Sequence, residues 1–228
     1  SGRSTLYLRR ALVVIQFILS ISFLTGTFIV YQQLNFIQSR NLGFSKETIL
    51  IFSSNRKLRQ QYPEFKAELL AINGAKGVTA TNSKLSYSDQ SISSVTWEGK
   101  DPDHDVLFHQ LMTDHDFVST YSISLAEGRD FSEEISSDSN AVLLNEAAIA
   151  QMNLKEPLNK QIAMEDWQGT IIGVVKDFNF KPAQKQIEPM IIFIDAANFY
   201  EISVKLSPRN LIDQVKAVEK KKKKFNPD

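Results

Sequence analysis

The feature that most constrains this chain is an apolar run from Ala11 to Tyr31, ALVVIQFILSISFLTGTFIVY, which has no charged residue and no proline. As a helix rising about 1.5 Å per residue, a run of this length spans roughly 30 Å, the hydrocarbon thickness of a bilayer. A helix also satisfies its own backbone polar groups, as lipid requires. The run therefore predicts a transmembrane helix at 11–31 that carries a folded domain.

Positive charges lie on one side of this run. Arg3, Arg9 and Arg10 precede it, and the next positive charge after it is Arg40. Because positively charged flanks stay on the cytoplasmic side, the asymmetry predicts a cytoplasmic N-terminal flank at 1–10. The domain that follows is then expected on the extracytoplasmic side.

Two other interpretations of the run remain. A cleavable signal peptide has a shorter apolar region followed by small residues, whereas here Tyr31-Gln32-Gln33-Leu34-Asn35 follows. A buried helix of a soluble protein rarely needs so long an uncharged stretch. The polar residues inside the run, Gln16, Ser20, Ser22, Thr25 and Thr27, are of the kind that hydrogen-bond across packed membrane helices, which hints at helical neighbours.

The helix is expected to continue past the membrane as a stalk at 32–43. The stalk residues Gln32, Leu34, Ile37 and Gln38 keep a helical pattern, with Leu34 and Ile37 extending an apolar stripe. Asn41-Leu42-Gly43 supplies a helix stop, since glycine suits a helix end. The remaining residues, 44–228, are predicted to form the folded domain.

The pattern of that domain predicts an α+β fold. Apolar runs indicate strands at 48–52, 77–81, 141–144, 170–175, 190–194 and 202–206, with a looser strand at 91–97 pairing with 107–112. Helical spacing indicates helices from Pro63 to Asn73-Gly74, at 117–121, at 146–152, and from Leu211 to Phe225. We therefore expect a strand–helix–strand lobe with an inserted β-rich lobe at about 83–131.

Composition excludes several kinds of site. The chain has no cysteine, which rules out disulfides, thiolate metal sites and a thiol nucleophile. Lys and Arg number 26, as do Asp and Glu, so net charge gives no reason to expect a nucleic-acid partner.

The densest polar segment holds Asp101, Asp103, His104 and Asp105, followed by His109, Asp114, His115 and Asp116. Its spacing fits neither an EF-hand loop nor HExxH, so a solvated loop is favoured over a metal site. No nucleophile elbow or phosphate-binding loop is present, and Glu133-Glu134 are neighbours that point apart. We predict no catalytic residue, no metal and no cofactor.

The run Lys220–Lys224 has two interpretations. It is either a surface for anionic lipid or the solvated end of a helix, where positive charge complements the helix dipole.

Several segments in order carry a resemblance to a known family. They are the span with its stalk, LVVIQFILSISFLTGTFIVYQQLNFIQSRNLGFSKETILI, then EGRDF (127–131), VLLNEAAIAQM (142–152), IIGVVKDFNF (171–180) and IEPMII (187–192). Together they resemble the permease subunit of MacB/FtsX-type ABC transporters, in versions common in Bacteroidetes-like bacteria. The matched part is the first transmembrane helix and the extracytoplasmic MacB-like core domain of one permease unit. The chain departs from the family at Asn153 and Asn159, where glycine is common.

The resemblance identifies a set of motif residues with structural roles: Gly128, Arg129, Phe131, Asn145, Glu146, Gly173, Asp177, Phe178, Phe180, Glu188 and Pro189. Independently of the family, glycine in Gly128-Arg129-Asp130-Phe131 permits a tight turn, Phe131 anchors it, and Arg129 is free to pair with a carboxylate.

The resemblance also implies a function and partners. It implies a non-catalytic subunit in a bacterial inner membrane, a second permease copy, a separate cytoplasmic ABC ATPase, and a periplasmic adaptor or lipoprotein. It further implies that the sequence is part of a longer permease whose domain moves with the membrane helices. The alternative function is a ligand-binding sensor domain of a single-pass receptor. No residue selects a substrate.

Overall fold

The computed structural model describes residues 2–39, 48–84, 91–101, 105–164, 167–178, 187–195 and 198–226. The chain divides into two compact units, Ser1–Asn41 and Leu42–Asp228, and each is described by itself.

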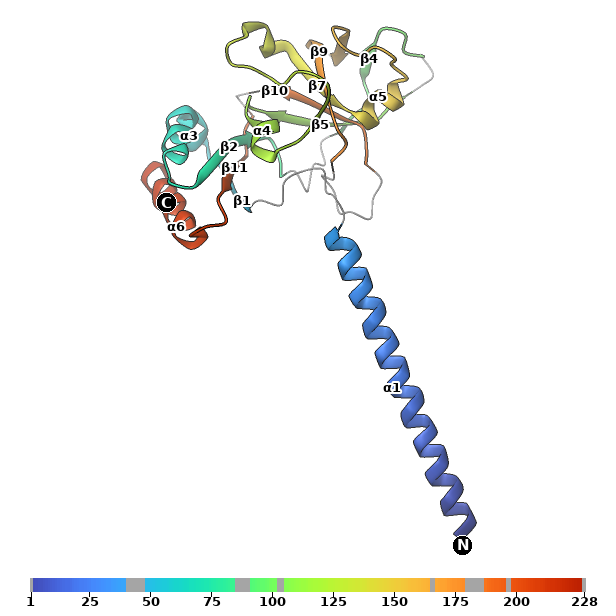
Figure 1. The fold of residues 1–228 in the computed structure, drawn as a ribbon. Helices are drawn as coiled ribbons and strands as arrows, with labels where there is room; N and C mark the ends of the chain where they lie inside the picture. Colours follow the sequence, from blue (N-terminus) through green and yellow to red (C-terminus); the bar gives the residue numbers. More distant parts are fainter. Residues whose placement is uncertain are drawn as a thin grey trace. The chain divides into compact units, whose positions relative to one another are not determined.

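The first unit is a single helix, α1 (Gly2–Ser39), drawn in blue in Figure 1. Within it, the 22 residues from Leu12 to Gln33 are long and apolar enough to cross a membrane, and none of that stretch is buried. The helix continues without a break past Tyr31, as predicted, although residues 40–43 of the expected stalk lie outside the described residues. The side chains of Leu34, Ile37 and Gln38 are also outside them.

Three of the polar residues of α1 are satisfied within the helix itself. The hydroxyls of Ser22, Thr25 and Thr27 each donate to the carbonyl four residues earlier, at 2.8 Å. Such bonds within one helix satisfy Ser and Thr hydroxyls in an apolar environment. By contrast, apolar side chains such as Phe23 and Leu24 are more than 70% exposed, which is the arrangement that lipid would cover.

The described residues of the second unit form an eleven-stranded sheet, with the order β1-β11-β2-β5-β10-β7-β9-β8-β4 along its path (Figure 1). In addition, β3 pairs with β5 and β6 pairs with β9. Neighbours are antiparallel except for the pairs β5–β10 and β7–β9. The strands are β1 (Thr48–Ser53), β2 (Ala75–Thr81), β3 (Ser91–Ile92), β4 (Val95–Trp97), β5 (Phe108–Thr113), β6 (Leu125–Gly128), β7 (Ala141–Asn145), β8 (Gln161–Met164), β9 (Trp167–Val175), β10 (Met190–Ile194) and β11 (Glu201–Leu206).

Helices begin and end where the sequence supplies caps. Asn55 accepts from Leu58 N at the start of its helix, and Asn145 accepts from Ala148 N in the same way. Asn153 ends a helix in the left-handed conformation, with φ 53°. The helices are α2 (Arg56–Gln60), α3 (Tyr62–Leu70), α4 (Phe117–Tyr121), η2 (Ser136–Asn140), α5 (Glu146–Met152) and α6 (Leu211–Phe225).

Three hydrophobic clusters divide this unit into two lobes. One cluster joins β1, β2 and β11 to α2, α3 and α6, and we call this the terminal lobe (described residues 48–84 and 198–226). The other two clusters lie on opposite faces of the central strands, since Met190 and Ile192 belong to one while Ile191 and Phe193 belong to the other. The described residues between 91 and 195 form this central lobe.

Most predicted elements are confirmed, with differences in pairing. The strand expected at 91–97 is two short strands: β3 pairs with β5 as predicted, but β4 pairs with β8. The β-rich segment at 83–131 is continuous with the rest of the sheet, because β5 lies between β2 and β10 and β6 pairs with β9. The pattern missed α2, β6, β8 and η2, which have at most five residues each and are too short for a clear period.

Candidate functional site

The two lobes meet where the sheet has the least ladder pairing, between β2 and β5. Thr81 and Thr113 are the one paired position in the described part of that boundary, whereas β11 and β2 have six. Side chains supplement it, since Thr113 Oγ1 donates to Ala80 O at 3.1 Å and Asn82 Oδ1 accepts from Met112 N at 3.1 Å. Two backbone hydrogen bonds also cross the boundary, from Asn82 N to Met112 O at 3.0 Å and from Asp114 N to Ala80 O at 3.3 Å. The geometry of the junction therefore depends on side-chain contacts together with a short stretch of backbone pairing.

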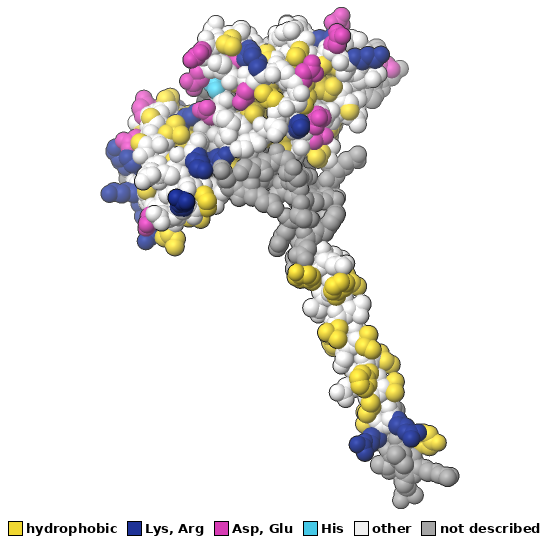
Figure 2. Space-filling model, viewed as in Figure 1, with side chains coloured by type: hydrophobic (Ala, Val, Ile, Leu, Met, Phe, Trp, Pro, Cys, Tyr) yellow, Lys and Arg dark blue, Asp and Glu magenta, His cyan; other side chains and the backbone are white. Residues whose placement is uncertain are grey.

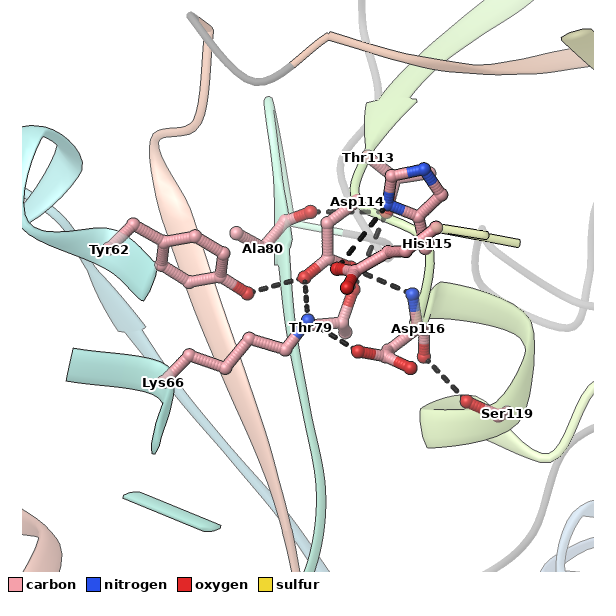
Figure 3. A network of polar contacts seen from close by, with 10 residues as sticks. Tyr62, Lys66, Thr79, Ala80, Thr113, Asp114, His115, Asp116 and Ser119 are labelled. Carbon is pink, nitrogen blue, oxygen red and sulfur yellow. Dashed lines mark hydrogen bonds and ion pairs between the residues drawn. The ribbon is translucent and has the colours of Figure 1, made fainter. Parts of the chain in front are cut away.

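Asp114, directly after β5, is the centre of these contacts (Figure 3). Its Oδ2 accepts from Tyr62 Oη at 2.5 Å and from Lys66 Nζ at 2.7 Å. Its Oδ1 accepts from Thr79 Oγ1 at 2.5 Å and from Asp116 N at 3.2 Å. One buried carboxylate of the central lobe thus binds three side chains of the terminal lobe.

The charges of this cluster are balanced by burial and pairing. Lys66 is 12% exposed and also pairs with Asp116, which is 48% exposed. Burial lowers the pKa of Lys66, but the two carboxylates outweigh it, so the pKa is raised and the amine stays charged. Burial, and then the charge of Asp114, raises the pKa of Tyr62, which keeps its hydroxyl a donor. The cluster is suited to holding two lobes together rather than to proton transfer.

Helix α4 ties the lobes together a second time. Its Tyr121 Oη lies 2.8 Å from Ser203 Oγ on β11, and Lys205 Nζ of β11 donates to Ser122 Oγ at 2.6 Å. A Cβ at Gly77 of β2 would lie 2.9 Å from Thr120 Oγ1, so α4 packs directly on the strand. All three contacts connect the central lobe to the terminal lobe.

The tight turn predicted at 128–131 is wrong: Gly128 is the last residue of β6, and Arg129 N still donates to Ile172 O of β9 at 3.1 Å. Arg129 donates to both oxygens of Asp138, at 2.6 and 2.7 Å, and Asp138 also accepts from Ser132 N at 2.9 Å. The hydrogen bonds from Arg129 are the main reason that the pKa of Asp138 is lowered. Phe131 is buried in the core. The segment that follows β6 is thus held by an ion pair with one buried partner.

Two motif glycines face each other across β6 and β9. Gly128 has φ 77° and is paired with Gly173. A Cβ at Gly128 would lie 2.3 Å from Ile172 O, and one at Gly173 would lie 2.4 Å from Arg129 O. Both positions need glycine because the backbones approach too closely for a side chain.

Asn145 fixes the start of α5 to β10. Its Oδ1 accepts from Ala148 N at 3.0 Å and from Met190 N at 2.8 Å, while its Nδ2 donates to Glu188 O at 3.0 Å. The side chain therefore caps α5 and positions the strand that follows Pro189.

The neighbouring motif residues complete the same cluster. Glu146 Oε2 accepts from Asp177 N at 2.9 Å, and Asp177 Oδ1 accepts from Ala147 N at 3.0 Å. Burial raises the pKa of Asp177. Glu188 Oε2 lies 2.6 Å from His109 Nε2, which joins β10 to β5.

The end of β9 closes the core. Phe178 is fully buried, with its ring 6.4 Å from that of Phe117, while Phe180 lies outside the described residues. His109 N donates to Pro189 O at 2.8 Å. The described motif residues at 145–189 thus hold α5 and β10 on the sheet.

Two open hollows flank α5, of about 750 and 360 Å³. Asp177 and Glu188 lie beside the first, and Glu127 and Glu146 beside the second. None of the described lining residues is Ser, Cys or His, so neither hollow offers a nucleophile with its base.

The His and Asp side chains considered for a metal site do not meet at one point in the described part of the chain. There, no three His, Asp or Glu side chains form a metal-binding group. His109 lies near Ser91 and Glu188, and Asp114 binds Lys66, whereas Asp103 and His104 fall outside the described residues. The expected solvated loop is wrong for His109, which is buried within β5, and for Asp114, which is buried at the lobe junction. Its position directly after a strand was the one signal that sequence offered.

The lysine run on α6 is partly engaged by the protein itself. Lys221 and Lys224 pair with Glu68 on α3, and these hydrogen bonds lower the pKa of Glu68 to about 2. Lys222 Nζ lies 5.0 Å from the ring of Phe52. Lys220 and Lys223 are exposed. The run therefore serves helix packing at three of its five positions.

Comparison with known proteins places this fold. A family profile described as "MacB-like periplasmic core domain" matches residues 11–220. A search of curated proteins found no match.

Solved structures resemble the chain in fold. The periplasmic region of MacB from Actinobacillus actinomycetemcomitans is 17% identical with a TM-score of 0.55, over 83% of this chain and 89% of that one. A domain of a putative permease protein from Porphyromonas gingivalis is 18% identical with a TM-score of 0.51, over 69% and 73%. The extracellular domain of the noncanonic ABC-type transporter YknZ from Gram-positive bacteria is 16% identical, with a TM-score of 0.49 over 75% and 87%.

Proposed function

Since the chain belongs to the family of MacB-like periplasmic core domains, we propose that it is the extracytoplasmic part of an ABC transporter permease that transmits mechanical work. ATP hydrolysis takes place on a separate cytoplasmic subunit, and the permease works as a pair of copies. The domain cooperates with a periplasmic adaptor or lipoprotein. The family match favours this role over the single-pass receptor.

One observation carries the proposal. Helix α1 runs unbroken from Gly2 to Ser39, so the stretch suited to a bilayer, Leu12–Gln33, and the first residues after it form one rigid rod. A continuous helix transmits rotation and tilt, whereas a flexible linker absorbs them. We assign residues 34–39 as the start of a lever between membrane and domain.

The exposed Arg9 and Arg10 support an orientation in which the N-terminus is cytoplasmic. The domain then lies outside the inner membrane, where an extracytoplasmic partner reaches it. In this arrangement the Asp114 cluster and α4 make the two lobes move together when α1 moves.

The test uses the intact permease with its ATPase in proteoliposomes. Inserting Gly-Gly after Gln38 should uncouple transport from ATP hydrolysis, because two glycines interrupt the helix. Inserting Ala-Ala at the same place keeps the helix and should retain more coupling. Inserting Gly-Gly after Gly99, in an exposed turn of the central lobe, is the matched control and should have no effect. Full transport by the first variant contradicts the lever.

A further inference from the structure

Although the net charge of the chain is balanced, its positive and negative side chains lie mostly in different lobes. In the described residues, the terminal lobe has 14 Lys and Arg against 5 Asp and Glu, whereas the central lobe has 5 against 15. Figure 2 shows the dark blue side chains gathered over α3 and α6, with the magenta ones mostly over the central strands. The domain is therefore strongly polarised, and its two ends present surfaces of opposite charge.

The positive charge of the terminal lobe lies mainly in solvent. Nine of its Lys and Arg residues are exposed, against three exposed acidic residues. The nine are Arg56, Lys57, Lys76, Lys84, Arg209, Lys216, Lys220, Lys223 and Lys224, and the last of them pairs with Glu68. The buried cations are already engaged, Lys66 by two carboxylates and Lys205 by Ser122. An anionic partner thus meets a surface whose own acidic groups are too few to neutralise it.

The outer face of α6 carries several of the exposed lysines of this surface. Ile212, Lys216, Lys220 and Lys223 follow one another at helical spacing, and all four are exposed, with Ile212 at 72%. The apolar face of α6 packs into the terminal lobe, so the attraction that this stripe offers is electrostatic, about 1 kcal/mol for each lysine near an anionic lipid surface.

The terminal lobe is also the one through which the chain enters the domain. Eight residues separate the end of α1 at Ser39 from the start of β1 at Thr48. Fully extended, eight residues reach at most about 28 Å. Whatever membrane holds α1 is therefore tethered to the basic lobe, and tethering raises the effective concentration of headgroups around it.

From this charge and this connection we propose that the terminal lobe binds anionic phospholipid headgroups of the membrane that α1 spans. The contact is electrostatic and reversible. It positions the domain against the bilayer in one state and releases it in another. The inference rests on α1 being a membrane span, not on transport.

The experiment uses the full chain in lipid nanodiscs. Because the chain has no cysteine, a single fluorophore can be placed at Ile212→Cys in the terminal lobe or at Gln168→Cys, also exposed, in the central lobe. The discs contain phosphatidylcholine with a headgroup spin label as quencher, either alone or mixed with phosphatidylglycerol. Comigration of protein with discs establishes insertion of α1 separately from docking of the lobe.

We expect the label at residue 212 to be quenched at least about twice as strongly in the phosphatidylglycerol discs. The difference should vanish near 1 M salt, where the Debye length is about 3 Å. Charge reversal of the α6 stripe, Lys216→Glu with Lys220→Glu and Lys223→Glu, should abolish it, whereas Lys155→Glu with Lys176→Glu in the central lobe should not. The label at residue 168 should not respond to lipid charge.

Equal quenching of residue 212 in the two kinds of disc, in a chain shown to be inserted, overturns the proposal. So does unchanged quenching after reversal of the stripe in a variant with a native near-UV circular dichroism spectrum. Binding of a soluble acidic protein without any response to lipid charge assigns the surface to a protein partner instead.

Discussion

Replacing Asp114 with asparagine tests whether the lobe junction depends on one buried carboxylate. The substitution keeps the size of the side chain but removes the charge that faces Lys66, which is 12% exposed. Breaking a buried pair by removing one partner costs about 3–5 kcal/mol. Because the amide oxygen still accepts from Tyr62 or Thr79, we expect Asp114→Asn to lose about 3 kcal/mol of unfolding free energy, with Asp114→Ala nearer 5.

The matched control is the second carboxylate on the same lysine. Asp116 is 48% exposed, so its pair with Lys66 is largely screened by water. Exposed ion pairs contribute about 0–1 kcal/mol, and Asp116→Asn should therefore cost no more than about 1 kcal/mol. A difference between the two variants isolates the effect of burial from that of charge.

The assay is urea unfolding of the full chain in detergent micelles, followed by the fluorescence of Trp97 and Trp167. A double-mutant cycle with Lys66→Met measures the coupling directly, and we expect the double variant to be more stable than the two single effects predict, by about 1–3 kcal/mol. Additive effects, or an Asp114→Asn loss no larger than that of Asp116→Asn, would refute the reasoning.

Three further predictions concern the turns and the pH dependence. Burial raises the pKa of Asp130 to about 6, so its ionisation opposes folding as pH rises from about 4 to 6. Asp130→Asn should therefore stabilise the domain at pH 7 by about 1–2 kcal/mol, allowing for solvent screening, and not at pH 4; equal effects at both pH values contradict this. Gly173→Ala should lower the free energy of unfolding by at least about 2 kcal/mol, because its Cβ would lie 2.4 Å from Arg129 O. Gly99→Ala, whose Cβ has nothing within 4 Å, should lower it by only about 1 kcal/mol. Equal losses in urea unfolding would exclude the close approach at Gly173. Asn153 has φ 53°, a left-handed conformation that alanine adopts less readily than asparagine or glycine. In thermal unfolding, Asn153→Ala should be about 1 kcal/mol less stable than the parent chain, and Asn153→Gly should be as stable or more stable. The reverse order would refute a conformational origin.

Sequence predicted the fold where the periodicity was long and the caps were specific. The apolar run, the helix opened by Pro63 and the strand at 170–175 all follow from pattern, because burial of one face imposes a period. The two family positions where asparagine replaces glycine are explained by the structure. Asn153 and Asn159 both have positive φ, and asparagine is the residue that best tolerates this after glycine.

Sequence could not predict the junction. Tyr62, Thr79 and Asp114 are up to 52 residues apart, and their meeting depends on β11 lying between β1 and β2 and on β2 lying beside β5. Strand order is a non-local property that hydrophobic pattern does not encode. The separation of charge between the lobes could not be predicted either, because the basic lobe combines residues 48–84 with 198–226, which are distant in the sequence.

The proposed lever would work only if the lobe junction is rigid. A helix can move a domain as a unit only if the domain does not yield at its weakest seam, and the seam between β2 and β5 is where Asp114 lies. The rigidity of α1 and the buried cluster are thus complementary requirements for transmission. In the proposed account, the basic terminal lobe binds lipid headgroups when the domain lies against the bilayer.

The most direct test measures the motion itself. A spin label at Gln60→Cys, exposed at the end of α2, reports the distance between the terminal lobes of two copies in the intact permease with its ATPase. The account predicts different distance distributions in the nucleotide-free and ATP-bound states, and loss of that difference after Gly-Gly insertion at Gln38 while ATP is still hydrolysed. Identical distributions in the two nucleotide states, in a permease that transports, would contradict mechanical transmission through this chain.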